Sequence, residues 1–143
     1  MDLRRLRLRA GLSQRELAAR TGIAQPNISA YESGRLTPSP ATRARIAAAT
    51  RMRPSRLAFR MRAQVIAAAE RHHATAVRVF GSAGTSSDTI DSDLDLLVHF
   101  TDEATLYDQV GLTEELEHLL GIKVDVISDG APGAERIRNA VLL

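Results

Sequence analysis

The charged residues of this chain are divided unequally between its two halves, which limits what the chain can fold into. Residues 1–62 contain fourteen arginines and three acidic residues, a formal net charge of +11. Residues 63–143 contain five basic and fourteen acidic residues, a formal net charge of −9. Such asymmetry indicates two parts with different partners. The basic part suits a polyanion, and the acidic part suits a metal ion or a basic partner. A bias in genome composition would favour arginine over lysine, but it would not segregate the acids.

Length and composition exclude several classes of protein. The 143 residues are enough for one average domain or two very small ones. The chain has no cysteine, so a disulfide scaffold, a thiolate zinc site and a cysteine nucleophile are all excluded. No apolar run approaches the ~20 residues that a membrane helix needs, and residues 1–9 lack the apolar core of a secretory signal. We therefore expect a cytoplasmic protein without a membrane partner.

The spacing of apolar residues changes along the chain. Residues 1–52 predict short helices, and a longer helix over about 55–73 joins the two parts. Three later segments have the composition of strands: 76–80, 94–100 and 124–127. A leucine-rich amphipathic helix separates the last two strands, and a short helix over 135–141 closes the chain. We predict an all-α domain over residues 1–60 and an α/β (α+β) domain with a small mixed sheet over residues 61–143.

Two of the short helices, over 13–21 and 24–32, have the features of a helix-turn-helix. Ser13 and Glu16 form a capping box at the start of the first helix, and Gly22 ends it. In a helix-turn-helix, the first residues of the second helix meet base edges in the major groove. The residues at these positions include Gln25, Pro26, Asn27 and, one turn on, Ala30. Gln14, at the start of the preceding helix, is placed to reach a phosphate, and these five residues are predicted to bind DNA. Six arginines would add non-specific attraction to phosphates: Arg4, Arg5, Arg7, Arg15, Arg20 and Arg35.

The segment around this capping box resembles the lambda-repressor-like (XRE) helix-turn-helix family. The resemblance covers about residues 2–58 and is carried by four runs: Leu12-Ser13-Gln14-Arg15-Glu16-Leu17-Ala18, Gly22-Ile23, Ile28-Ser29 and Tyr31-Glu32-Ser33-Gly34. It implies sequence-specific binding of operator DNA by a homodimer. Domains of this kind also serve as protein docking modules, which is the alternative interpretation.

A glycine-serine pair and three aspartates carry the chemistry of the second part. Asp93 and Asp95 are two residues apart in a strand, so their side chains share one face. Adjacent carboxylates repel each other, and a divalent cation such as Mg²⁺ removes the conflict. Asp125 lies in an apolar strand and would complete a triad of catalytic, metal-binding carboxylates. Gly81 lets a backbone approach a phosphate, and the Ser82 hydroxyl can donate a hydrogen bond to it. The alternative is a polar turn that merely precedes a strand.

The motif around the glycine-serine pair resembles the polymerase-beta-type nucleotidyltransferase superfamily, specifically its minimal nucleotidyltransferase (MNT) branch. The resemblance covers about residues 60–143 and is carried by four runs: Val79-Phe80-Gly81-Ser82, Asp91-Ser92-Asp93-Leu94-Asp95-Leu96-Leu97-Val98, Lys123-Val124-Asp125-Val126-Ile127 and the closing Ile137-Arg138-Asn139-Ala140-Val141. One departure follows Gly-Ser-x, where the family has Ala-Arg-Gly and this chain has Gly84-Thr85-Ser86. Thr85 thus stands in the place of an arginine. If that arginine helps to hold the triphosphate, nucleotide affinity is reduced in this chain.

The same resemblance implies a mechanism and a partner. Asp93 and Asp95 hold Mg²⁺, which bridges the phosphates of ATP, while Asp125 helps to bind the metal and accepts the proton of the attacking hydroxyl. Minimal nucleotidyltransferases of this branch resemble antitoxins that are encoded beside HEPN-domain RNase toxins. Such an antitoxin transfers AMP to a tyrosine of the toxin or simply binds it.

Three functions are therefore compared. The first is an antitoxin that binds operator DNA and transfers AMP to a HEPN toxin, which makes it a protein adenylyltransferase. The second is a non-catalytic DNA-binding regulator whose nucleotidyltransferase half only binds toxin or nucleotide, and Thr85 and Ser86 favour it. The third is nucleotidylation of an antibiotic. The lack of a second lobe for a small acceptor and the presence of a DNA-binding domain argue against the third.

Overall fold

The computed structural model describes residues 2–143, which form two compact units: a first that ends at Met52 and a second, Arg53–Leu143. The first unit is helical, and the second combines helices with a small mixed sheet, as the sequence predicts. The sequence places the domain boundary near residue 60. Helix α5 (Pro54–Arg60) packs against two other helices of the second unit. Among the described residues, no helix combines the length and the apolar character needed to cross a membrane.

The first unit contains four helices: α1 (Leu3–Arg9), α2 (Gln14–Thr21), α3 (Gln25–Glu32) and α4 (Pro40–Ala49). The predicted capping box begins α2. The amide of Glu16 donates to the hydroxyl of Ser13, and the amide of Ser13 donates to the carboxylate of Glu16. Gly22 ends α2 in the left-handed conformation, with φ 65°. These local signals fix the start and the end of the helix that precedes the turn.

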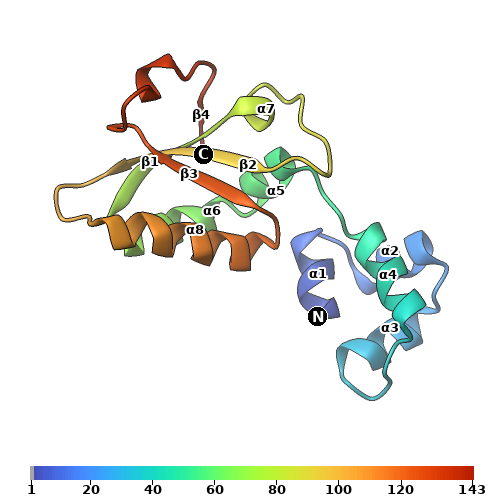
Figure 1. Ribbon diagram of the computed structural model, residues 1–143. Helices are drawn as coiled ribbons and strands as arrows, with labels where there is room; N and C mark the ends of the chain where they lie inside the picture. Colours follow the sequence, from blue (N-terminus) through green and yellow to red (C-terminus); the bar gives the residue numbers. More distant parts are fainter. Residues whose placement is uncertain (1) are drawn as a thin grey trace. The chain divides into compact units, whose positions relative to one another are not determined.

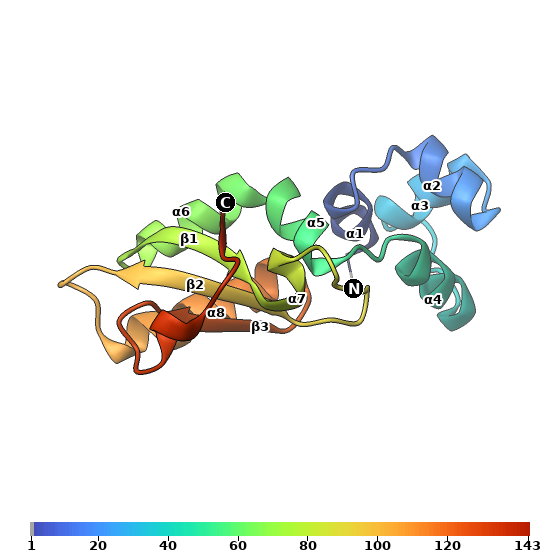
Figure 2. The same cartoon turned by 90° about the horizontal axis from the view of Figure 1, so that it is seen from above.

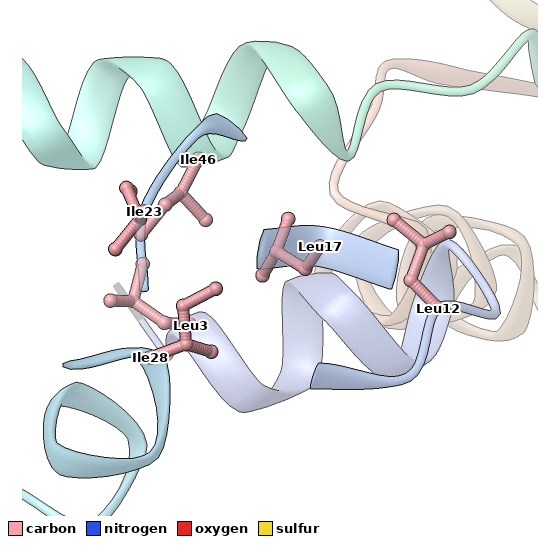
Figure 3. Packing of buried hydrophobic residues seen from close by; sticks show 6 residues of the cluster. All are labelled: Leu3, Leu12, Leu17, Ile23, Ile28 and Ile46. Carbon is pink, nitrogen blue, oxygen red and sulfur yellow. The ribbon is translucent and has the colours of Figure 1, made fainter. Parts of the chain in front are cut away.

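Six buried aliphatic side chains hold the four helices together: Leu3, Leu12, Leu17, Ile23, Ile28 and Ile46. Figure 3 shows them converging from all four helices and the intervening turns. Burying each one removes apolar surface from water and contributes roughly 1.5–3 kcal/mol to the stability of the unit. Leu8 does not join them, because its position on α1 leaves it 53% exposed.

The second unit contains four α-helices and a 3-10 helix: α5 (Pro54–Arg60), α6 (Arg62–Arg71), α7 (Gly81–Gly84), α8 (Leu106–Leu120) and η1 (Ala134–Arg136). Its strands are β1 (Ala74–Phe80), β2 (Leu94–Phe100), β3 (Val124–Ser128) and β4 (Val141–Leu142). The single helix predicted over 55–73 is wrong. The chain leaves the helical conformation at Met61, with φ −100° and ψ 19°, which separates α5 from α6.

The four strands form a mixed sheet in the order β3-β2-β1-β4. β2 runs parallel to β3, and β1 is antiparallel to β2 and to β4. Helix α6 packs on β1 and α8 packs on β3, and Figure 1 shows both on the same face of the sheet. Leu94, Leu96 and Val98 of β2 are fully buried. Residues that alternate with them, such as Asp95, face the other side of the sheet.

The chain after β3 crosses the sheet before it ends. Because β3 and β4 are the two outer strands, the connection between them passes over β2 and β1. Figures 1 and 2 show this segment on the face that α6 and α8 leave open. The closing helix predicted over 135–141 is therefore wrong. Ile137 is extended and Asn139 has φ 59°, so the helix stops after η1 and the chain continues into β4.

Candidate functional site

Two parallel strands bring the three predicted aspartates to one end of the sheet. Asp95 of β2 lies opposite Asp125 of β3 in the register, and Asp93 immediately precedes β2. The amide of Leu94 donates to the carbonyl of Lys123 at 3.0 Å, which aligns the starts of both strands. Asp95 is half-buried, whereas Asp93 and Asp125 are exposed. The three carboxylates thus gather where β2 and β3 begin, open to solvent.

This end of the sheet carries an excess of negative charge. Burial raises the pKa of Asp95, and the charges of Asp125 and Asp93 raise it further. Lys123 acts in the opposite direction, with its Nζ 3.5 Å from Oδ2 of Asp93. Both members of that ion pair are largely exposed, so the pair contributes little. The carboxylates are therefore short of cations within the fold, an arrangement that favours a cation from solution.

The donor set suits a hard divalent cation that also binds substrate. Mg²⁺ prefers oxygen ligands, and it commonly uses one or two carboxylates and completes its shell with water and phosphates. Across residues 2–143, no three His, Cys, Asp or Glu side chains are placed so that they could hold a metal ion together, and this includes the three predicted aspartates. The aspartates consequently fit a shared Mg²⁺ that a nucleotide helps to hold, rather than an ion enclosed by protein alone.

A glycine loop follows β1 and lies directly against Asp95. Phe80, the last residue of β1, is opposite Asp95 in the antiparallel register. Gly81 has φ 63°, and a Cβ at this position would collide with Oδ2 of Asp95. Glycine suits this left-handed backbone conformation, and any other residue here would have to displace the Asp95 carboxylate. Ser82 comes next, half-buried in α7, and its carbonyl accepts the amide of Ser87 at 2.9 Å.

The residues that depart from the family motif close this loop on itself. The Thr85 hydroxyl lies 3.3 Å from the carbonyl of Gly81, 3.2 Å from that of Ser82 and 2.9 Å from the Ser87 hydroxyl. Ser86 has φ 57°, a left-handed conformation that glycine adopts without strain. The loop thus keeps a glycine-like backbone at residue 86, but residue 85 offers no cation to a phosphate.

Asp88 anchors the far end of the loop, and the sequence analysis missed it. Its side chain is only 2% exposed. It accepts hydrogen bonds from the amide and the hydroxyl of Ser55, each at 2.8 Å. These bonds tie the loop to the first turn of α5, where backbone amides need partners. No local pattern marks Asp88, because its partner is 33 residues away in the chain.

Four of the five predicted DNA-binding residues lie at the starts of α2 and α3. Nε2 of Gln25 donates to Oε1 of Gln14 at 2.7 Å, and Pro26 and Asn27 are exposed. Ala30 does not lie with them. It is only 8% exposed, and its carbonyl accepts the amide of Leu36 at 3.2 Å. The prediction that Ala30 offers atoms to a base is corrected on this ground.

Arg7, which the sequence analysis placed among the phosphate-binding arginines, is instead an internal cation. It is 8% exposed, and its Nε and Nη2 donate to the carboxylate of Glu32 at 2.6 and 2.9 Å. Nη1 donates to the carbonyl of Leu12 at 2.8 Å. Gln14 also donates to Glu32, at 3.0 Å. The pKa of Glu32 is lowered, chiefly by its hydrogen bond with Arg7. This network connects α1, α2 and α3 and orients the Gln14–Gln25 pair.

Comparison with known proteins agrees with both parts of this description. A family model described as "Helix-turn-helix" matches residues 3–57. A model described as "Polymerase beta, Nucleotidyltransferase" matches residues 63–140, which are more than half of the chain.

Two proteins of Methanocaldococcus jannaschii, each named "Putative protein adenylyltransferase", are similar to part of this chain. One is 36% identical over 72 residues, covering 50% of this chain and 74% of that protein. The other is 38% identical over 58 residues, covering 41% of this chain and 62% of that protein. A solved structure titled "Structure of putative minimal nucleotidyltransferase" superposes with a TM-score of 0.55 at 43% identity, and the match covers 64% of this chain and 97% of that one. This chain belongs to the polymerase beta nucleotidyltransferase family, and a helix-turn-helix domain precedes its minimal nucleotidyltransferase domain.

Proposed function

We propose that this chain is the antitoxin of a HEPN/MNT toxin–antitoxin pair that binds its operator DNA and transfers AMP from ATP to a HEPN-family RNase toxin. The observation that carries the transferase half is the register of Asp95 and Asp125 beside the glycine loop at Gly81. The names of the two M. jannaschii relatives support a protein as the acceptor. Operator DNA and ATP both place this activity in the cytoplasm.

The chemistry follows from the arrangement of the carboxylates. Asp93 and Asp95 would hold Mg²⁺, which orients the triphosphate and stabilises the charge that develops on it. The hydroxyl of the acceptor tyrosine attacks the α-phosphorus, forming an O–P bond. The bond from the α-phosphorus to the bridging oxygen breaks, and pyrophosphate leaves. Asp125 is exposed and lies opposite Asp95, so its carboxylate can help to hold the metal and accept the proton of the hydroxyl. Gly81 lets the loop backbone approach the phosphates, and Ser82 donates to them.

The proposal for DNA rests on the starts of α2 and α3. Glutamine and asparagine pair with adenine through two hydrogen bonds. Gln14 holds Gln25 by a hydrogen bond, as the network above shows, and Asn27 stands free of the core beside it. A single small unit offers little contact area, so we expect a homodimer on the operator. Binding its own operator would let the antitoxin regulate its synthesis.

AMP transfer is tested with the protein encoded beside this gene. That partner is incubated with the purified chain, ATP and Mg²⁺ and is then weighed by intact mass spectrometry. A parallel sample contains Asp93→Asn together with Asp95→Asn. We expect additions the size of AMP on the partner, and we expect them to vanish with the double variant. A stable complex that forms without any addition would contradict transfer.

A non-catalytic regulator is the second candidate, and Thr85 is the observation that favours it. The Thr85 hydroxyl stays with the loop backbone, where an arginine would reach a phosphate. In this alternative, the nucleotidyltransferase domain only binds toxin or nucleotide, and no pyrophosphate is released. A pyrophosphate assay on the same incubation separates the two candidates.

DNA recognition is tested separately with Gln25→Ala and Asn27→Ala. Each variant should weaken operator binding by about 1–3 kcal/mol, the contribution of one good base contact, and leave binding to random DNA unchanged. Gln64→Ala removes an exposed glutamine of α6 and serves as the matched control. If both α3 variants bind the operator as the parent does, α3 is not the recognition helix.

A further inference from the structure

Residues 63–143 contain five basic side chains, and the second unit has four further arginines at its start: Arg53, Arg56, Arg60 and Arg62. Three of the five are close to carboxylates: Arg71 to Glu115, Arg78 to Asp129 and Lys123 to Asp93. The other two, Arg136 and Arg138, are exposed and lie on the segment that crosses the open face of the sheet. This segment therefore carries two exposed cations over the face that also presents the aspartates.

The crossing segment is seated directly on the glycine loop. A Cβ at Gly84 would lie 2.8 Å from the carbonyl oxygen of Asn139 and 2.9 Å from that of Val79. Both contacts are with backbone, so neither can move away cheaply, and only glycine allows the segment to approach this closely. Beyond the contact, the amide of Leu143 donates to the carbonyl of Val77 at 2.9 Å. The end of the chain is thus held against the loop at residue 139 and against β1 at residue 143.

Arg138 is the neighbour of Asn139 and therefore stands close to the nucleotide loop. Gly84 lies three residues, about 5 Å along the axis of α7, after Gly81. Consecutive Cα atoms are about 3.8 Å apart. The distance that remains between the backbone of Arg138 and Gly81 is one that a long arginine side chain and an extended triphosphate can span together.

We propose that Arg138 binds the β- or γ-phosphate of the nucleotide and supplies the cation that Thr85 does not. The assignment rests on the proposed nucleotide site. A guanidinium presents several N–H donors in a planar fork that matches the oxygens of a phosphate. The loop itself provides a hydroxyl at Thr85 that stays with the carbonyls of Gly81 and Ser82. Gly84 then has a role of its own, because its lack of a side chain lets the segment that bears Arg138 lie against the glycine loop.

Equilibrium binding to the full chain tests this assignment without relying on turnover. Isothermal titration measures α,β-methylene-ATP, which cannot transfer AMP, and AMP itself, both with Mg²⁺. Arg138→Ala should weaken binding of the analogue on the order of tenfold, as expected for one charge-assisted hydrogen bond, and change AMP binding by less than about twofold. Arg138→Lys should recover part of the loss. Arg136→Ala removes the same charge two residues away and should match the parent.

Each other outcome overturns the assignment in a distinguishable way. If Arg138→Ala binds the analogue as the parent does, Arg138 is not a phosphate ligand and the nucleotide site stands. If Arg136→Ala and Arg138→Ala weaken binding equally, the effect is general attraction and not a specific contact. If the parent binds neither nucleotide, the proposed site fails and the assignment fails with it. Thermal melting of both variants confirms that these exposed substitutions leave the fold intact.

Discussion

Glu32 in the helical unit and Asp95 in the sheet unit are both carboxylates partly removed from water, yet their surroundings are opposite. Glu32 is paired with Arg7 and receives a further hydrogen bond from Gln14, and its pKa is lowered. Asp95 lies beside Asp125 and Asp93, and its pKa is raised by burial and by these two charges. One carboxylate has found its cation inside the fold, and the other has been placed among like charges.

The difference separates a structural carboxylate from a functional one. A carboxylate that is paired and hydrogen-bonded favours the folded state, because its charged form is better stabilised there than in water. Crowded carboxylates weaken the fold, and such local conflicts are typical of functional sites. The Glu32 network positions Gln14 and Gln25 within the helical unit, whereas Asp95 has like charges as neighbours and, on the proposed function, an external cation as its partner.

The largest expected effect is on the free energy of unfolding. Its sign should differ between a substitution that neutralises Glu32 and one that neutralises Asp95. The Arg7 and Glu32 side chains are 9% and 5% exposed. Glu32→Gln leaves the Arg7 charge buried without its partner and should lower the free energy of unfolding of the helical unit by about 3 kcal/mol. Asp95→Asn removes a repelled charge and should not lower that of the sheet unit. Urea unfolding of the full chain, followed by circular dichroism without divalent metal, measures both.

A paired replacement controls for the loss of packing. Arg7→Met combined with Glu32→Leu removes both charges and should recover most of the stability lost in Glu32→Gln, because apolar side chains of similar volume commonly replace a buried ion pair. A Glu32→Gln protein that unfolds at the same urea concentration as the parent would show that the ion pair does not stabilise the helical unit. A clear loss in Asp95→Asn would show that Asp95 is structural too.

The next effect concerns the contact between the glycine loop and Asp95. Gly81→Ala and Gly133→Ala both place a side chain at positive φ, 63° and 88°. Each should therefore cost about 1 kcal/mol of stability. Only Gly81→Ala displaces the Asp95 carboxylate, since no atom lies within 4 Å of a Cβ at Gly133. AMP transfer should fall at least about tenfold in Gly81→Ala, corresponding to 1.36 kcal/mol or more in the barrier, and stay unchanged in Gly133→Ala. Equal AMP transfer by the two variants would show that the contact between Gly81 and Asp95 does not affect the carboxylate site.

The elements predicted well from the sequence are those specified by nearby residues. The capping box of Ser13 and Glu16 and the helix end at Gly22 involve residues within one turn of each other, and both are confirmed. The break at Met61 has no glycine or proline to announce it. Strand β4 has only two residues and exists because it pairs with β1. Its position depends on a partner some sixty residues earlier in the chain, which no local pattern contains.

The same limit explains the corrected site residues. The approach of Asp95 to Asp125 could be predicted, because strand alternation and an acid within an apolar strand are visible in the sequence. Arg7 looked like any other arginine of a basic segment, since Glu32 is 25 residues away. Ala30 has a recognition-helix position, but it is buried in the folded unit. Long-range contacts decide which polar residues are structural, and the sequence alone does not display them.

The smallest expected effect is a pH dependence that isolates the charge of Glu32. Its pKa is lower in the folded protein than in the unfolded chain, where a glutamate titrates near pH ~4.3. Its contribution to stability is therefore present above that pH and is lost as the pH falls through the folded-state pKa. The stability difference between the parent and Glu32→Gln should narrow over this acid range. Other acids with lowered pKa values, such as Glu115, are common to both proteins and cancel in the difference.

Urea midpoints of the two proteins, measured in steps from neutral pH into this acid range, test that expectation. Glu114→Gln, which changes an exposed glutamate of α8, should track the parent at every pH. A narrowing difference would show that Glu32 stabilises the helical unit through its charge, as the contrast with Asp95 requires. A constant difference would instead assign the loss in Glu32→Gln to hydrogen-bond geometry. The charge of Glu32 would then not be what stabilises the fold. Glu32 and Asp95 would differ only in that the proposed function gives Asp95 an external cation to bind.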